Sequence, residues 1–127
     1  MKFGMLHTCI RVMDLEKSLD FYKNALGLKV VKELDYPEYE FSLVYLSDEE
    51  ENYELELTYN YNPEKPYELG NGFSHIALSV KDLEVAHSKH KDLGYEVTDM
   101  KGLPGNPPNY FFVKDPDGYS VEIIREK

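Results

Sequence analysis

Polar and apolar side chains alternate in two similar stretches of this chain, residues 6–12 and 75–80. In the first stretch, one face would carry Leu6, Thr8, Ile10 and Val12. The opposite face would carry His7, Cys9 and Arg11. The second stretch would place Ile76, Leu78 and Val80 on one face. Because successive side chains of a strand point to opposite faces, both stretches are predicted strands, with His7 and His75 at equivalent positions.

Helix signals follow each predicted strand. Asp14 and Asp82 stand where a capping oxygen accepts from the first free amides, and Gly27 and Gly94 stand where a left-handed stop is favoured. The apolar residues between these limits recur at helical spacing, namely Leu15, Leu19, Tyr22 and Leu26, then Leu83, Ala86 and Leu93. The second helix also contains two histidines that we expect on its surface, His87 and His90.

Further strand signals complete each half. In the first half they cover residues 28–31, 41–46 and 53–59, with an acidic hairpin tip at 48–52. In the second half they cover residues 96–97, 110–113 and 119–124, with a tight Asp-Pro-Asp-Gly turn at 115–118 and a loop at 99–109. The pattern predicts an α+β fold of two tandem βαβββ modules in a single domain. Module one covers about 4–60, a linker about 61–73, and module two about 74–127.

Length, charge and cysteine content narrow the functional classes. The 127 residues are 42% hydrophobic and 30% charged, as expected for one globular domain. The net charge of −10 disfavours nucleic acid and anionic lipid as partners. No apolar run is long enough for a membrane span or a signal peptide, and the single cysteine, Cys9, has no intrachain disulfide partner. A cytoplasmic protein is therefore expected.

The duplication also repeats candidate chemistry. His7 to Glu16 align with His75 to Glu84, and each half ends in an apolar strand interrupted by one glutamate, Glu56 or Glu122. Two imidazoles and two carboxylates form a mixed nitrogen and oxygen set suited to a divalent metal with open positions for substrate. A single such residue is usually a surface group, but the repetition of both favours a metal site. Cys9, on the face of His7, is expected to be a small packing residue, with a soft metal ligand and a reactive thiol as the alternatives.

Two further polar residues share the faces of these candidate ligands. Arg11 lies four residues after His7, and Asn60 lies four residues after Glu56. A guanidinium and an amide beside a metal would bind the carboxylate and amide groups of a small anionic ligand, since Arg holds a carboxylate with two hydrogen bonds. A solvated surface role for Arg11 is an equal alternative on the pattern alone.

The motifs Leu6-His7-Thr8, Glu56-Leu57-Thr58-Tyr59-Asn60, His75 to Val80 and Asp115 to Tyr119 followed by Glu122 resemble the glyoxalase I (lactoylglutathione lyase) family of the vicinal oxygen chelate superfamily. The resemblance implies a homodimer with the metal at the subunit interface. His7 and Glu56 would come from one chain, and His75 and Glu122 from its partner. It also implies that Arg11 and Asn60 hold the glutamyl end of glutathione, and that nickel or cobalt is favoured over zinc.

The resemblance implies an enzyme of methylglyoxal detoxification. It would isomerise the hemithioacetal of methylglyoxal and glutathione to S-lactoylglutathione. Glu122 is the favoured base and Glu56 the near-symmetric alternative. An acyl-coenzyme A epimerase and a metal-free drug-binding module of the same fold are the competing hypotheses, and a related thiol in place of glutathione is also open.

Overall fold

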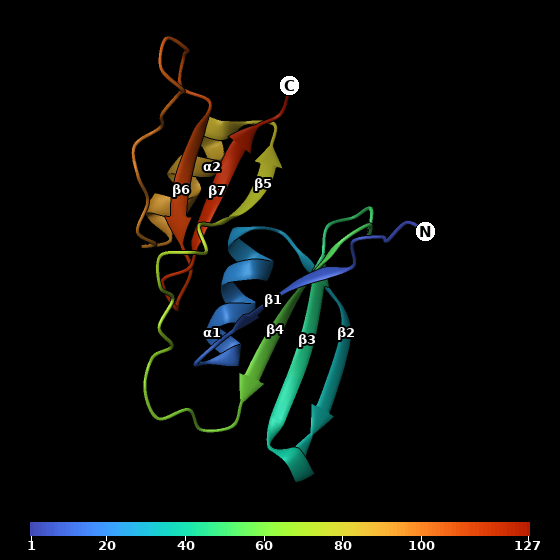
Figure 1. The fold of residues 1–127 in the computed structure, drawn as a ribbon. Helices are drawn as coiled ribbons and strands as arrows, with labels where there is room; N and C mark the ends of the chain where they lie inside the picture. The colour runs from blue at the N-terminus through green and yellow to red at the C-terminus, as the bar shows by residue number, and fades with distance from the viewer. The chain divides into compact units, whose positions relative to one another are not determined.

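The computed structural model describes all residues 1–127, which form two compact units, Met1–Glu68 and Leu69–Lys127. Each unit combines one mixed β-sheet with helical structure (Figure 1). The α+β class predicted from the sequence is therefore confirmed. No helix of the chain has the length and apolar character needed to cross a membrane.

The first unit follows the predicted βαβββ order. It contains β1 (His7–Arg11), α1 (Leu15–Asp20), the π-helical turn η1 (Phe21–Ala25), β2 (Lys29–Tyr36), the short 3-10 turn η2 (Pro37–Tyr39), β3 (Phe41–Ser47) and β4 (Glu54–Asn60). The sheet order is β1-β4-β3-β2, with β1 parallel to β4 and the other pairs antiparallel. Strand β2 is longer than predicted, because its charged outer half pairs with β3 as an edge strand.

The first helix begins and ends where the sequence predicts. Asp14 caps α1 by accepting from the Lys17 amide at 3.1 Å, and Gly27 follows the helical segment with a φ of 71°. The buried stripe differs from the predicted one. It consists of Ser18, Phe21, Tyr22 and Ala25, whereas Leu15, Leu19 and Leu26 are only half-buried. The change from α to π geometry at Phe21 rotates the apolar stripe relative to a regular helix.

The helical segment of the first unit lies against one face of its sheet (Figure 1). This face carries the buried residues Ile10, Val44, Leu46, Leu55 and Leu57. Alternation along the strands therefore directs His7, Cys9 and Arg11 of β1 and Glu56, Thr58 and Asn60 of β4 to the other face. Leu6, predicted on the inner face, precedes β1 and is 75% exposed.

The second unit repeats this plan in shorter form. It contains β5 (Ile76–Val80), α2 (Leu83–Asp92), β6 (Tyr110–Lys114) and β7 (Ser120–Arg125), with sheet order β5-β7-β6. Strand β5 is parallel to β7, as β1 is to β4. Asp82 caps α2 through the Val85 amide at 3.1 Å, and Gly94 follows with a φ of 87°. Buried Phe111, Val113, Val121 and Ile123 form the helix-facing side of the sheet.

The predicted strand at residues 96–97 is not a regular strand in the structure. Val97 and Lys101 make isolated bridges to Val113 and Tyr110. The Thr98 hydroxyl accepts from the Phe112 amide at 3.0 Å, so a side chain takes a place that a ladder carbonyl would fill. The following loop contains three prolines and two glycines, which prevents the pairing from continuing.

The surface position predicted for His90 is wrong, and His87 is half-buried. His90 is 2% exposed, and its ring meets the edge of Phe111 at a centroid distance of 5.6 Å. His87 also contacts Phe111, and its Nε2 lies 2.8 Å from the Thr98 carbonyl. Leu93, which continues the predicted apolar spacing, caps the end of α2 and is 52% exposed. The inner face of α2 is thus formed by Leu83 and the two imidazoles.

The two predicted turns are confirmed. At the acidic hairpin tip, Asp48 accepts from the backbone amides of Glu50 and Glu51. In the second unit, the Asp115 carboxylate accepts from the amides of Asp117 and Tyr119 at 2.9 Å each. Gly118 takes a φ of 91°, which few other residues adopt. The latter turn delivers the chain into β7, the strand that carries Glu122.

Candidate metal centre

In the first unit the fold brings His7 and Glu56 together. Their strands, β1 and β4, are parallel neighbours, with Cys9 opposite Glu56 in the register. The His7 Nε2 atom lies 3.1 Å from Glu56 Oε1. The imidazole is 38% exposed and the carboxylate 11%. This is an accessible ring beside a carboxylate that is largely shielded from solvent.

The second unit builds the same pair from His75 and Glu122. His75 immediately precedes β5, and Glu122 lies in the parallel neighbour β7, opposite Ala77. The Nε2 to Oε1 distance is again 3.1 Å. Both pairs lie on the sheet face opposite the helix of their unit, because the flanking residues Leu55, Leu57, Val121 and Ile123 face the core. The duplication seen in the sequence is therefore a duplication of geometry.

Glu56 accepts hydrogen bonds from its own face of the sheet. The Thr58 hydroxyl donates to Glu56 Oε2 at 2.8 Å, and the Cys9 thiol lies 3.3 Å from the same oxygen. The Cys9 sulfur is also 3.1 Å from the Thr58 hydroxyl oxygen. Partial burial alone would raise the pKa of Glu56, but the donors Thr58, Cys9 and Tyr45 and the nearby His7 lower it below its ordinary value. The carboxylate form of Glu56 is favoured.

The same cluster changes the chemistry of its neighbours. Burial, followed by the interaction with Glu56, raises the pKa of Tyr45 to about 12. Burial and Glu56 also raise the pKa of the Cys9 thiol, against the opposing effect of Thr58. Both side chains thus remain protonated hydrogen-bond donors at neutral pH.

The second pair has a different environment. His75, not Glu122, has the additional polar partner, since the Ser74 hydroxyl lies 2.7 Å from His75 Nδ1. Phe112 stands against the imidazole, with ring centroids 5.2 Å apart and an interplanar angle of 85°. Tyr45 occupies this place beside His7, at 5.6 Å and 76°. An aromatic ring therefore packs edge-on against each histidine.

The packing role predicted for Cys9 is wrong. Cys9 is exposed and faces the same side of the sheet as His7, where it interacts with Glu56 and Thr58. Alternation along the strand places Thr58 on the face of Glu56, but the sequence reasoning gave Thr58 no role. It missed Tyr45 as a neighbour of Glu56, because the place of Tyr45 opposite Glu56 depends on the register of β3.

Arg11 and Asn60 lie on the same sheet face, toward the far end of the strands. Arg11 is opposite Thr58 in the register, and Asn60 follows Thr58 by two residues. Both residues are exposed. The Asn60 amide donates to the Tyr67 hydroxyl at 3.3 Å. The face thus presents, in order along β1, an imidazole, a thiol and a guanidinium.

The donor chemistry of each pair fits a divalent metal. Imidazole nitrogen and carboxylate oxygen bind such ions at about 2.0–2.2 Å, so two neighbouring ligands of one ion lie roughly 3 Å apart. The separation in both pairs, 3.1 Å, has this value. The structure gathers no group of three or more His, Cys, Asp or Glu side chains able to hold a metal ion. Each unit supplies one pair of ligands.

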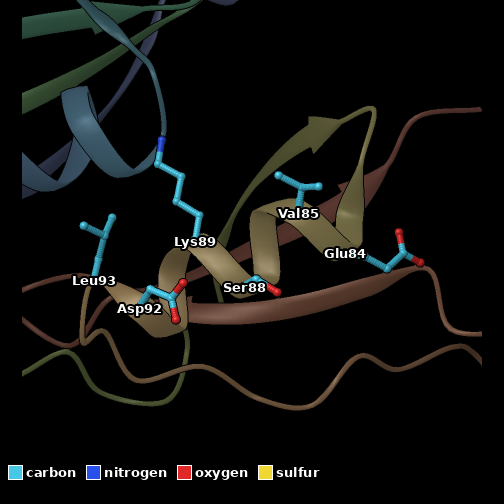
Figure 2. Close-up of a pocket in the computed structure, with 6 residues that line it drawn as sticks. All are labelled: Glu84, Val85, Ser88, Lys89, Asp92 and Leu93. Atoms are coloured by element: carbon cyan, nitrogen blue, oxygen red, sulfur yellow. The ribbon is translucent and has the colours of Figure 1, made fainter.

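A separate shallow pocket lies on the outer surface of α2 (Figure 2). It is lined by Glu84, Val85, Ser88, Lys89, Asp92 and Leu93. Glu84 at its edge forms a two-pronged ion pair with Arg125, at 2.6 and 2.9 Å. Because α2 covers the core side of the sheet, this pocket is on the side away from Glu122. It contains neither member of the His75–Glu122 pair.

Comparison with known proteins places the chain in a family. The sequence profile of the Glyoxalase/Bleomycin resistance protein/Dioxygenase superfamily matches residues 4–123. The chain belongs to this superfamily.

Within the superfamily, the chain is similar to lactoylglutathione lyases. It is 44% identical to a probable lactoylglutathione lyase of Synechocystis over 124 residues, 95% of this chain and 94% of that protein. It is also 44% identical to the lactoylglutathione lyase of Neisseria meningitidis serogroup A, over 97% of this chain and 91% of that protein. The trypanothione-dependent glyoxalase I of Leishmania major superposes with a TM-score of 0.84 at 37% identity, covering 98% of this chain and 88% of that one. The family resemblance inferred from the motifs is confirmed.

Proposed function

We propose that this protein isomerises the hemithioacetal of methylglyoxal and glutathione to S-lactoylglutathione. The observation that carries the proposal is the repeated His–Glu pair, built with the same 3.1 Å separation in both units. The similarity to lactoylglutathione lyases over nearly the whole chain supports it. The reaction detoxifies methylglyoxal, and its use of glutathione accords with a cytoplasmic location.

The proposed metal ligands are His7, Glu56, His75 and Glu122. A divalent ion held by these side chains would act as a Lewis acid toward the two neighbouring oxygens of the hemithioacetal. The donors are nitrogen and oxygen only, which suits nickel, cobalt or zinc, and we favour nickel or cobalt. The two pairs together supply four ligands, which leaves two positions of a six-coordinate ion for substrate.

We further propose that the protein works as a homodimer. In each subunit, the two units form a single domain. One subunit would supply His7 and Glu56, and the partner subunit would supply the other pair. Each unit supplies only two ligands, too few to hold a catalytic ion, so the proposed site requires the two pairs to meet. The assignment of the pairs to different subunits follows the family resemblance.

The chemistry requires a proton to move between two adjacent carbons. One carboxylate removes the proton from the hemithioacetal carbon and returns it to the neighbouring carbon, while the hydroxyl proton passes to the former ketone oxygen, so that a thioester and an alcohol replace a thiohemiacetal and a ketone. We assign this role to Glu122. Arg11 and Asn60 are proposed to bind the glutamyl end of the glutathione, because a guanidinium holds a carboxylate with two hydrogen bonds.

The proposal is tested by thioester formation from methylglyoxal and glutathione, followed by ultraviolet absorbance. Protein stripped with a chelator is reconstituted separately with nickel, cobalt and zinc, and stripped protein is the control. We expect activity with nickel or cobalt and none without added ion. Absence of thioester formation with every ion that binds would contradict the proposed reaction.

A further inference from the structure

Glu56 and Glu122 stand at equivalent points of the two units, yet their surroundings differ. Glu56 lies in β4, parallel to β1, and Glu122 lies in β7, parallel to β5. Each faces away from the helix of its unit. The register places Cys9 and Tyr45 on either side of Glu56. It places Ala77 and Phe112 on either side of Glu122. The duplication thus provides an internal control for each contact of Glu56.

Apart from the histidine, the three polar neighbours of Glu56 are replaced by apolar side chains at the corresponding places around Glu122. Cys9 corresponds to Ala77, and Tyr45 corresponds to Phe112. Thr58, opposite Arg11 in the register, corresponds to Ile124, opposite Ser79. The Glu122 carboxylate pairs with His75, whose Nε2 lies 3.1 Å from Oε1.

The donors around Glu56 form a connected group. The single hydroxyl hydrogen of Thr58 is directed to Glu56 Oε2, so the Thr58 oxygen is available to accept from the Cys9 thiol. The thiol hydrogen is therefore shared between Thr58 and the same carboxylate oxygen. With Oε1 at His7 and Oε2 at these donors, both oxygens of Glu56 are held.

The second unit restrains the other member of its pair. His75 Nδ1 has the Ser74 hydroxyl at 2.7 Å. The residue at the corresponding place before His7 is Leu6, which is apolar. A hydrogen bond to the distal nitrogen of a ligating imidazole fixes its ring orientation. The first unit therefore fixes its carboxylate, whereas the second fixes its imidazole.

We infer that Cys9 and Thr58, with Tyr45, are positioning residues that confine Glu56 to its ligand role and leave Glu122 as the carboxylate free to move to the substrate proton. This inference rests on the proposed function. Glu56 and Glu122 occupy equivalent positions of the repeat, and these three side chains account for their unequal roles.

A spectroscopic signature tests the contact itself. Because Cys9 is the only cysteine, the S–H stretching band of the metal-free protein reports this thiol alone. We expect the band at lower wavenumber in wild type than in Glu56→Ala/Thr58→Val, which removes both side-chain acceptors and leaves only the more distant Ile10 carbonyl at 3.9 Å. Ala77→Ser, remote in sequence from the cluster, is the matched control and should leave the band in place. An unchanged band in the double variant would overturn the inference.

Metal affinity tests the positioning role. Zinc alone is titrated into the metal-free protein in competition with a chromophoric chelator. We expect Cys9→Ala/Thr58→Val to bind about 10- to 100-fold more weakly, the usual cost of losing groups that orient a metal ligand. Cys9→Ser/Thr58→Ser keeps both donors and should recover most of the affinity. Wild-type affinity in the first variant, or no recovery in the second, would overturn the inference.

Transplanting the donors tests the inequivalence of the two glutamates. Ala77→Cys/Ile124→Thr would place the same donors beside Glu122. At a saturating concentration of the metal ion, we expect kcat to fall by roughly tenfold, because about one net hydrogen bond must break before Glu122 can move. Metal affinity should not fall. An unchanged kcat in this folded variant would overturn the inference.

Wild-type protein that binds zinc and nickel but forms no thioester would instead contradict the proposed reaction. In that case the zinc affinity and the S–H band remain the tests of Glu56 positioning.

Discussion

The first unit surrounds its glutamate with a hydroxyl, a thiol and a phenol, whereas the second unit leaves its glutamate between alanine, isoleucine and phenylalanine. The His–Glu distance is nevertheless 3.1 Å in both. The backbone plan of the repeat thus sets the ligand pair, while the neighbouring side chains set how firmly each ligand is held. In a duplicated protein, these neighbours are the place to look for different roles of equivalent residues.

Substitution of the two glutamates gives the largest expected difference between the units. In the metal-loaded protein, Glu122→Gln should lower kcat by about 10²- to 10⁴-fold, because it removes the proposed base. Glu56→Gln should chiefly weaken metal binding, measured by titration of the stripped protein. Circular dichroism checks that both variants fold. Near wild-type turnover in a folded Glu122→Gln variant would remove Glu122 from the base role.

Arg11 gives the next largest effect. Arg11→Ala should raise the KM for the hemithioacetal roughly tenfold with little change in kcat, since a hydrogen bond to a charged group contributes about 1.5–3 kcal/mol. Ser79 occupies the corresponding place in β5. Ser79→Ala is therefore the matched control, with KM expected to be unchanged. An unaltered KM in Arg11→Ala would exclude Arg11 from binding the thiol.

The helix caps are a feature that the two units share, and their substitution tests whether both caps stabilise the protein equally. Asp14 and Asp82 accept from the amide three residues on at the same distance, 3.1 Å. Asp14→Ala and Asp82→Ala should each lower the free energy of unfolding by about 1 kcal/mol, measured by urea denaturation. Asparagine at either position should restore most of it. A loss confined to one cap would show that the helices of the two units contribute unequally.

The ion pair between Glu84 and Arg125 gives the smallest effect, at acid pH. Hydrogen bonds from Arg125 lower the pKa of Glu84 from 4.5 to about 2. The stabilisation is therefore complete above pH 4.5 and is lost as the pH falls toward 2. The Tm difference between wild type and Glu84→Gln should be small and should shrink over this range, and salt should reduce it because the pair is exposed. A difference that grows on acidification would contradict this assignment.

Much of the fold could be predicted because the duplication repeats each local signal. His7 and His75, Asp14 and Asp82, and Gly27 and Gly94 mark the same strand, cap and stop in each half, and the structure confirms these elements. The strand at 96–97 was predicted from the same repeat and is not formed. A threonine hydroxyl and the proline-rich loop after it replace the regular ladder there.

The side-chain environments were harder to predict than the elements. The burial of His90 depends on its edge contact with Phe111, a residue on a strand far along the chain. In the same way, the neighbours of Glu56 come from three strands whose register is fixed only by the folded sheet. Alternation alone identified the face of Cys9 correctly, but the general tendency of free cysteine to be buried favoured packing over hydrogen bonding. Long-range register is the information that the sequence pattern lacks.

The central claim, that two His–Glu pairs from two subunits make one catalytic site, is tested most directly by complementation. One variant carries His7→Ala/Glu56→Ala and the other His75→Ala/Glu122→Ala, and each alone should be inactive. When the two are coexpressed and the mixed dimer is isolated with different affinity tags, one intact site should be restored. The account predicts about half of the wild-type activity per dimer in nickel-loaded protein. An inactive, metal-replete mixed dimer would contradict it.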